Sequence, residues 1–214
     1  MKCLICSSLC NSFEDMRWGV LYYECDSCHL IMKSPKHLSN FKEQKKRYDL
    51  HQNSSDSSGY RAYFERFIDF VLPLEPKPLR GLDFGCGATS LLADILAEHD
   101  IGTDFYDPIY HSDRVYESRV YDLIVSVEVF EHLHDPKTTF GMLVEHLAVD
   151  GYIAIQTALR PDSKEEFLNW YYRLDPTHVL FFSINSLEVL ASEFGMRVIK
   201  SDKRQMVLMK RRRE

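Results

Sequence analysis

Hydrophobic positions in the C-terminal two thirds of the chain alternate between short continuous runs and a three-to-four-residue spacing. The continuous runs have the length of buried strands and cover residues 79–84, 101–106, 121–127 and 152–157. The wider spacing is that of amphipathic helices and covers residues 60–72 and 89–99. A closing pair of strands is expected at residues 196–200 and 205–209. This alternation predicts an α/β fold, a doubly wound parallel sheet with helices on both faces.

Capping residues mark the ends of two further helices. Asp135 followed by Pro136 is the pattern of an N-cap with proline in the first helical position. Asn185 and Glu188 have the spacing of a capping box. A helix is therefore expected after Asn185, and Gly195 is expected to end it.

The N-terminal residues carry paired cysteines instead of this alternation. Two Cys-x-x-Cys turns lie eighteen residues apart and contain Cys3, Cys6, Cys25 and Cys28. This is the spacing of a zinc ribbon, in which each turn aims two thiolates at one tetrahedral ion. A strand is expected at residues 20–23. Four thiolates leave no position for water, so the predicted zinc is structural; the alternative is four unrelated buried thiols.

Polar residues separate this unit from the alternating strands and helices. Residues 53–59 (NSSDSSG) favour a loop or linker, and prolines follow the helix at residues 60–72. The predicted organisation therefore has three parts. They are a zinc ribbon over residues 1–34, a helical linker or lid over residues 35–78, and an α/β domain over residues 79–214.

Composition excludes several classes of protein. The chain has 214 residues, 45% of them hydrophobic and 27% charged, which is typical of a soluble globular protein. No run approaches the 18 or so apolar residues of a membrane span, and the first residues lack the apolar core of a signal peptide. A cytoplasmic location is therefore expected, where six cysteines favour metal binding or packing over disulfides.

The uneven distribution of charge along the chain indicates which kind of binding partner is favoured. Residues 51–196 carry 24 acidic and 10 basic residues, whereas residues 197–214 carry 2 and 8. An acidic body is not typical of a general nucleic-acid binder, although the basic ends leave a narrower RNA contact open. A small-molecule acceptor fits this balance better.

Candidate chemistry begins at the turn after the first predicted strand. Gly85, Cys86 and Gly87 lie where open α/β sheets bind ligands, and glycines let a ligand approach the backbone. Asp107 follows twenty residues after Gly87, a distance typical of the acid that binds both ribose hydroxyls. Ser90 occupies the position where a dinucleotide site needs glycine or alanine. A nucleoside ligand without a pyrophosphate therefore fits better.

These residues resemble known motifs. Residues 81–87 (GLDFGCG) resemble the first motif of class I S-adenosylmethionine (SAM)-dependent methyltransferases, and residues 121–133 (YDLIVSVEVFEHL) resemble their strand-four motif. The chain is still more similar to a bacterial branch with an N-terminal zinc ribbon. The shared segments are residues 48–53 (YDLHQN), 59–61 (GYR), 106–108 (YDP) and 170–179 (WYYRLDPTHV). The resemblance covers nearly the whole chain and implies a Rossmann-like methyltransferase sheet.

The resemblance also implies roles for individual residues. The loop of Gly85, Cys86 and Gly87 would lie against the methionine part of SAM, and Asp83 would orient that loop. Asp107, with Asp104 as a nearby competitor, would hold the ribose. The methionine part would also be faced from the neighbouring strand by Ser126, Val127 and Glu128.

One interval departs from the family pattern. Thirteen residues separate Asp107 from Tyr121. A strand with its crossover helix does not fit, because one crossover needs at least ten to twelve residues. The third strand is therefore expected to be reduced or absent. The second strand would then be an edge, and residues 38–53 are the unassigned stretch long enough to cover it.

Three residues are candidates for the acceptor side. His178 is the candidate base for an acceptor that must lose a proton, because the usual pKa of histidine is near physiological pH. Glu131 and His132 follow the fourth-strand motif and could also reach the acceptor. The alternative is structural, a histidine that fixes its loop and a hydrogen-bonded pair at a helix entry. The aromatic residues of an insertion after the fifth strand could line the acceptor pocket or bury their own segment; they are Trp170, Tyr171, Tyr172, Phe181 and Phe182.

The sequence thus predicts a SAM-dependent methyltransferase with a structural zinc ribbon. Two other functions remain open. One is an NAD-dependent enzyme on a similar sheet, which Ser90 and the strand-four motif disfavour. The other is a catalytically inert module that binds RNA or protein through the ribbon and the basic ends.

Overall fold

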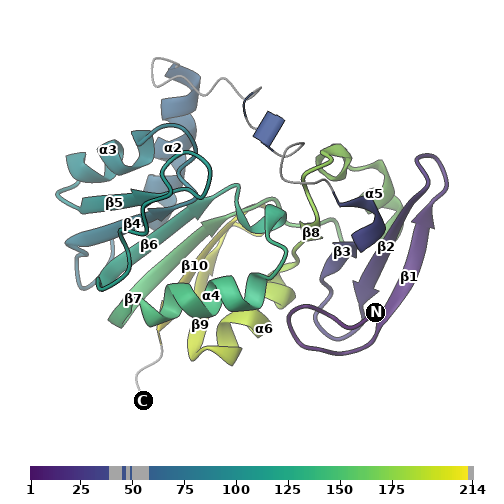
Figure 1. Ribbon diagram of the computed structural model, residues 1–214. Coiled ribbons are helices and arrows are strands. Elements are labelled where there is room, and N and C mark those ends of the chain that lie inside the picture. Colours follow the sequence, from purple (N-terminus) through teal and green to yellow (C-terminus); the bar gives the residue numbers. More distant parts are fainter. Residues whose placement is uncertain (39–44, 47–48, 50–57, 212–214) are drawn as a thin grey trace.

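The computed structural model describes residues 1–38, 45–46, 49 and 58–211. Within them the chain forms a six-stranded sheet and a smaller four-stranded sheet (Figure 1). The larger sheet has the spatial order β5 (Gly102–Tyr106), β4 (Arg80–Phe84), β6 (Tyr121–Val127), β7 (Leu147–Gln156), β10 (Met206–Arg211) and β9 (Met196–Ser201). All the strands expected from the apolar runs are present.

The larger sheet is mixed, not parallel as the alternation predicted. β5, β4, β6 and β7 are parallel, whereas β10 is antiparallel to both β7 and β9. β10 runs antiparallel because the turn that joins it to β9 is too short for a crossover connection. The Asp202 carboxylate closes this turn by accepting hydrogen bonds from the amides of Arg204, Gln205 and Met206.

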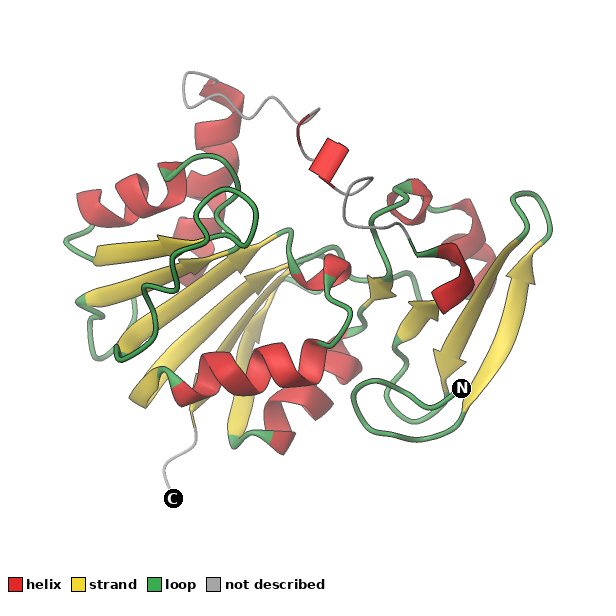
Figure 2. Ribbon diagram, viewed as in Figure 1, coloured by secondary structure: helices red, strands yellow, loops and turns green. Residues whose placement is uncertain are grey.

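Helices cover both faces of this sheet, as predicted (Figure 2). α2 (Ser58–Val71) and α3 (Leu91–Glu98) pack on one face, and α4 (Pro136–Glu145) and α6 (Ile184–Glu193) pack on the other. The Asp135 carboxylate caps α4 through the amide of Thr138 at 3.0 Å, which confirms the predicted cap. The predicted cap of α6 was wrong, because Ser183 and not Asn185 caps that helix. No helix among the described residues is long and apolar enough to cross a membrane.

The third strand of the family pattern is absent. Residues 108–120 contain turns and no helix or strand, which confirms the expectation from the short interval. β5 is consequently an edge of the sheet. Most of residues 38–53, the expected cover of this edge, lie outside the described residues, as do Tyr48 and His51. Asp49 is described, and its carboxylate accepts a hydrogen bond from the Tyr110 hydroxyl, just beyond β5, at 2.7 Å.

The N-terminal unit is a small antiparallel sheet that includes a strand from the α/β part. Its order is β1 (Cys10–Asp15), β2 (Val20–Cys25), β3 (Ile31–Lys33) and β8 (Leu180–Phe181). The strand expected at residues 20–23 is β2. β8 follows an insertion after β7 that contains α5 (Lys164–Asn169) and the 3-10 helix η3 (Tyr171–Leu174). Figure 1 shows this insertion lying against the β1–β2 hairpin.

The two parts share buried surface. Ile5, Leu30 and Met32 belong to the same hydrophobic cluster as Phe130 and Phe182. Phe181 and Phe182 are fully buried, so they bury their own segment and do not line a pocket. Residues 1–34 thus share a hydrophobic core with residues 79–214, and the insertion after β7 lies between the two parts.

Candidate functional site

The loop after β4 has the geometry that its glycines predict. Gly85 and Gly87 have φ angles of +83° and +69°, and a Cβ at Gly85 would collide with the side chain of Val129. A Cβ at Gly87 would meet nothing within 4 Å. The amides of Gly85 and Cys86 donate to the carbonyl of Tyr106 at 2.8 and 3.1 Å. Gly85 is therefore required by the fold, whereas Gly87 leaves open space beside the backbone.

Asp107 lies beside this loop, at the end of β5. Its carboxylate accepts hydrogen bonds from the amides of Gly87 at 3.1 Å, Ile109 at 2.8 Å and Tyr110 at 3.0 Å. The competitor Asp104 instead accepts from Arg119 and from the Tyr121 hydroxyl. The structure therefore brings Asp107, and not Asp104, to the glycine loop.

Asp83 is the buried acid of the same site. Its side chain is 2% exposed. Burial and the nearby charge of Asp107 raise the pKa of Asp83 to about 8. A bound cation would stabilise the ionised carboxylate at this position, because it would offset the loss of water. Cys86 is also buried, and its thiol donates to the carbonyl of Gly87.

The residues at the C-terminal end of β6 have two different roles, one structural and one in the candidate site. The Ser126 hydroxyl is fully buried and donates to the carbonyl of Phe84 at 2.9 Å, so its side chain ties β6 to β4. Val127 is half-buried. Glu128 has a φ of +54°, and its carboxylate accepts hydrogen bonds from the hydroxyls of Tyr63 and Tyr172, each at 3.0 Å. This backbone turn directs Glu128 away from the strand and into a polar network.

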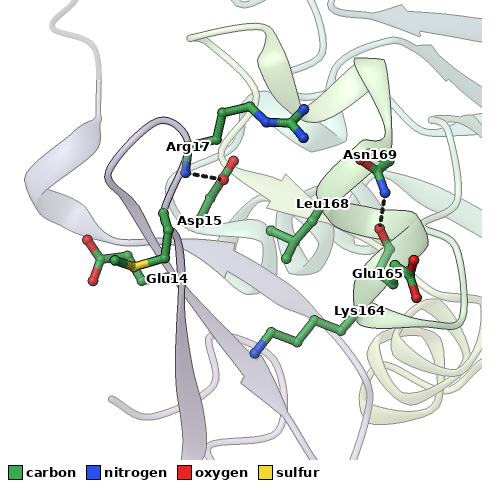
Figure 3. A pocket seen from close by; sticks show the side chains of 8 residues that line it. Glu14, Asp15, Arg17, Lys164, Glu165, Leu168 and Asn169 are labelled. Carbon is green, nitrogen blue, oxygen red and sulfur yellow. Dashed lines mark hydrogen bonds between the residues drawn. The ribbon is translucent and has the colours of Figure 1, made fainter.

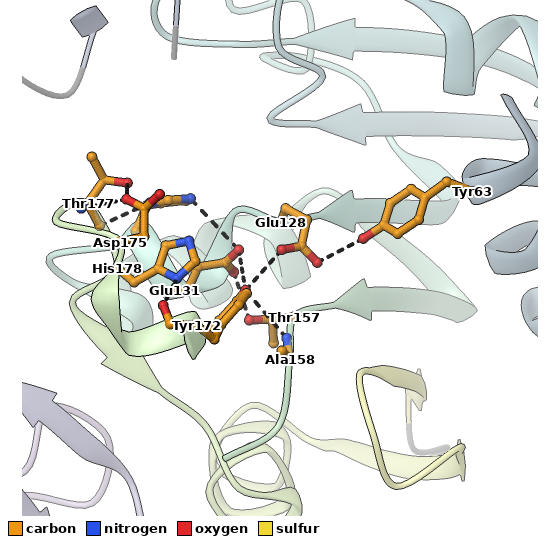
Figure 4. Close-up of polar contacts among 10 residues, drawn as sticks. Tyr63, Glu128, Glu131, Thr157, Ala158, Tyr172, Asp175, Thr177 and His178 are labelled. Carbon is orange, nitrogen blue, oxygen red and sulfur yellow. Dashed lines mark hydrogen bonds and ion pairs between the residues drawn. The ribbon is translucent and has the colours of Figure 1, made fainter. Parts of the chain in front are cut away.

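A second carboxylate completes that network (Figure 4). Glu131 belongs to the 3-10 helix η2 (Phe130–His132) and is fully buried. It accepts hydrogen bonds from the hydroxyls of Tyr172 and Thr157, each at 2.7 Å. Burial and Glu131 raise the pKa of Glu128 to about 8, and burial also raises the pKa of Glu131. The single Tyr172 proton thus lies between two acids whose pKa values are both raised by burial.

Two histidines lie next to these acids. The ring centroids of His132 and His178 are 4.8 Å apart, and Nε2 of His132 is 3.8 Å from the Glu131 carboxylate. The structure therefore brings together all three residues predicted for the acceptor side. Burial, reinforced by His132, lowers the pKa of His178 to about 3. His178 is thus neutral at physiological pH but a weak base, so its role as a base stays a prediction.

The sequence did not indicate the partners of these groups. Tyr172 was noted only as one of several aromatic residues, yet its hydroxyl bridges Glu128 and Glu131. Tyr63 comes from α2 and Thr157 from the end of β7. No local pattern marks hydroxyls that meet from such distant segments. Only Thr157 could have been found from the sequence, because it follows a predicted parallel strand and such positions lie at the ligand edge of the sheet.

A family model described as a methyltransferase domain matches residues 57–201, more than half of the chain. The chain belongs to this methyltransferase domain family. The match includes the glycine loop, Asp107 and the network around Glu131.

Solved structures share the fold of this methyltransferase domain. An O-methyltransferase family protein from Burkholderia thailandensis has 13% identity and a TM-score of 0.59, over 79% of this chain and 62% of that one. A putative O-methyltransferase from Nostoc punctiforme PCC 73102 has 13% identity and a TM-score of 0.54, over 83% and 70%. Mitomycin 7-O-methyltransferase has 14% identity and a TM-score of 0.55, over 79% and 59%. The chain thus spans about 60–70% of their lengths. No curated protein matches the sequence.

The four paired cysteines of the methyltransferase chain form a second site. The sulfur atoms of Cys3 and Cys28 are 3.5 Å apart and those of Cys6 and Cys25 are 3.4 Å apart, and all four lie within 4.8 Å of one another. Sulfur atoms at about 2.3 Å from a tetrahedral zinc would be about 3.8 Å apart. The geometry is therefore compatible with one ion. Cys10 is not part of this group, and its thiol donates to the carbonyl of Ser8.

A hollow of about 560 Å³ lies elsewhere on the methyltransferase chain, between the β1–β2 turn and α5 (Figure 3). Its lining mixes both charges and comprises Glu14, Asp15, Met16, Arg17, Lys164, Glu165, Leu168 and Asn169. None of these residues belongs to the glycine loop or to the network around Glu131. The hollow is therefore separate from the ligand edge of the sheet.

Proposed function

We propose that the chain transfers a methyl group from SAM to a small-molecule acceptor. The observation that carries the proposal is the contact between the Gly87 amide and the Asp107 carboxylate at the ligand edge of a methyltransferase-domain sheet. Gly87 leaves open space beside the backbone, and Asp107 is an acceptor for ribose hydroxyls. The neighbouring O-methyltransferase folds support an oxygen as the atom methylated.

The backbone and the charges of this site support SAM as its ligand. The backbone of Gly85, Cys86 and Gly87 would lie along its methionine part. Asp83, whose burial disfavours the ionised form, would gain a compensating cation in the amino group of SAM. Ser126 would contribute backbone only, because its hydroxyl is already bonded to Phe84. Val127 and Glu128 would then face the ligand.

Methyl transfer from SAM asks for alignment more than for acid or base chemistry, because the sulfonium supplies an already activated methyl group. This chain's own residues must hold the acceptor in line with that group and exclude water. Glu131, His132 and His178 lie together on the side of the network away from α2 and are the residues we propose for the acceptor side. Tyr172 and Thr157 would fix the position of Glu131.

We further propose that Cys3, Cys6, Cys25 and Cys28 hold one structural zinc ion. The four sulfur atoms lie close enough for one tetrahedral ion, and four thiolates would leave no position for a substrate. Such a site needs reduced cysteines, which favours the cytoplasm.

Isothermal titration with SAM, S-adenosylhomocysteine and NAD⁺ tests the function of the α/β part. We expect the first two to bind with one site per chain and NAD⁺ to give no heat. Absence of SAM binding by well-folded protein would reject the proposal. Binding of NAD⁺ alone would favour the dinucleotide-dependent alternative.

A further inference from the structure

Three metal-ligating side chains converge in the polar network around Tyr172, on the side we propose for the acceptor. One ligand atom from each of Glu131, His132 and His178 lies within 4.8 Å of the others. In the part of the chain that the structure describes, the only other such group is the cysteine cluster. Glu131 and His132 come from η2, immediately after β6, and His178 comes from the segment before β8. The fold thus assembles this group from two segments far apart in sequence.

Both imidazoles are oriented by backbone carbonyls. Nδ1 of His132 is 3.0 Å from the carbonyl oxygen of Thr177, and Nδ1 of His178 is 2.8 Å from that of Tyr172. A carbonyl can only accept, so each Nδ1 carries the proton and each Nε2 keeps a lone pair. A histidine that binds a metal through one nitrogen almost always donates its other N–H to such a group. The two rings therefore have the tautomer and the anchoring that ligands need.

Among the described residues, no lysine or arginine neutralises the acids of this network. Among the ion pairs of the described residues, neither Glu128 nor Glu131 pairs with a lysine or arginine. Lys33 lies in this region, but its ammonium group donates to the carbonyls of Asp175 and Pro176. The Tyr172 hydroxyl has one proton and faces both carboxylates. Buried carboxylates are costly unless a cation or hydrogen bonds compensate them, and a metal ion would supply the missing positive charge.

We propose that Glu131, His132 and His178 bind one divalent transition-metal ion. Two imidazoles and one carboxylate favour Mn²⁺, Fe²⁺, Co²⁺ or Zn²⁺ over Mg²⁺ and Ca²⁺, which prefer oxygen ligands. Three protein ligands leave coordination positions open, unlike the four thiolates of the cysteine cluster. The His132 side chain is 17% exposed, so the group is not sealed from solvent.

If the chain transfers a methyl group as proposed, a metal ion at this position also indicates which class of acceptor it takes. An acceptor hydroxyl bound to the ion would lose its proton to solvent more readily, because a bound cation lowers the pKa of an oxygen ligand. The acceptor oxygen then forms a bond to the methyl carbon. The carbon–sulfur bond of SAM breaks, and its electron pair stays on sulfur. The inferred acceptor is therefore a small molecule with a metal-ligating hydroxyl.

Manganese binding to the full, zinc-loaded chain tests this site, because Mn²⁺ binds thiolates weakly. Electron paramagnetic resonance of free Mn²⁺ during titration gives the bound fraction. We expect one Mn²⁺ per wild-type chain, and at least about 10-fold weaker binding by His178→Ala and Glu131→Gln. Glu131→Gln retains the size of the side chain, so it reports on the site even where His178→Ala does not fold. His99→Ala changes an exposed histidine at the end of α3 and should bind as the wild type does.

SAM titration of the same samples separates this proposal from the proposed function. Intact SAM binding together with no Mn²⁺ or added Zn²⁺ beyond the cysteine-bound ion would overturn the metal site and leave the methyl-transfer proposal standing. Equal Mn²⁺ affinity in the wild type, His178→Ala and Glu131→Gln would overturn it too. Mn²⁺ binding that Glu131→Gln weakens, in protein that takes up no SAM, would support the metal site and reject the proposed function.

Discussion

The guanidinium group of Arg173 lies 2.6 Å from the carboxylate of Asp15, and both side chains are buried. Asp15 ends β1 of the N-terminal unit, whereas Arg173 belongs to η3, next to Tyr172. Arg173 also donates to the carbonyl of Leu168, so it fixes the path of the insertion after β7. The cysteine-bearing hairpin is thereby coupled to the segment that places Tyr172 and His178.

Arg173→Ala should destabilise the protein strongly. The variant leaves Asp15 buried without its partner, which typically costs about 3–5 kcal/mol of unfolding free energy. Lys77→Ala is the matched control, because Lys77 pairs with Asp100 at 2.9 Å on the exposed surface and should cost about 0–1 kcal/mol. Urea unfolding followed by circular dichroism measures both. Similar midpoints for the two variants would show that the buried pair does not join the two parts.

Zinc removal should affect the α/β part as well as the hairpin. A unit that packed only on itself would unfold locally, but Cys3, Cys25 and Cys28 belong to the same hydrophobic cluster as Phe130 and Phe182. We expect Cys25→Ser to lose the ion, to melt at a lower temperature and to exchange amide hydrogens faster in β8 and η2. Cys10→Ser is the control, because Cys10 is outside the metal group, and it should retain one zinc. Faster exchange confined to residues 1–34 would contradict this coupling.

Local patterns predicted the elements of the α/β part well. The apolar run at residues 121–127 coincides with β6, because a central parallel strand is buried on both faces and leaves a continuous signal. The short interval after Asp107 was enough to predict the missing third strand. The cap of α6 was wrong because serine and asparagine are both good N-caps, and only backbone conformation distinguishes Ser183 from Asn185.

Contacts between distant segments were not predictable from the sequence. The pairing of β3 with β8 joins Met32 to Leu180, and neither segment carries a pattern that specifies the other. β1 was missed because its outward residues are polar and its strand signal is short. His178, Glu131 and His132 were selected as acceptor-side candidates, but their meeting depends on this pairing. The contact of the Tyr172 hydroxyl with Glu128 and Glu131 likewise depends on the fold and has no local sequence signal.

The contribution of Asp83 to the unfolding free energy should fall as pH rises from about 5 to 8. The pKa of Asp83 is about 8 in the folded protein against an ordinary value of 3.8, so between these values the folded state binds the proton and the unfolded state does not. Stability from this group is therefore present at low pH and is lost as pH rises, by up to about 1.4 kcal/mol per pH unit. The difference between wild type and Asp83→Asn, measured by urea unfolding without ligands, isolates this group from Glu128. A difference independent of pH would mean that Asp83 is ionised throughout.

Asp107→Asn should weaken SAM binding far more than Asp104→Asn. Asp107 lies at the glycine loop, and its carboxylate would accept the ribose hydroxyls, whereas Asp104 is bonded to Arg119 and Tyr121. Hydrogen bonds to a charged group contribute about 1.5–3 kcal/mol, which corresponds to roughly 10–150-fold in affinity. Asparagine keeps the side-chain oxygen that accepts from the amides of Ile109 and Tyr110, so the turn after Asp107 should stay folded. Its amide nitrogen replaces the oxygen that accepts from Gly87, so the loss includes that contact with the glycine loop. Isothermal titration of both variants, with melting curves as a check on folding, gives the comparison. Equal losses of affinity, or a loss only in Asp104→Asn, would move the ribose contact away from Asp107.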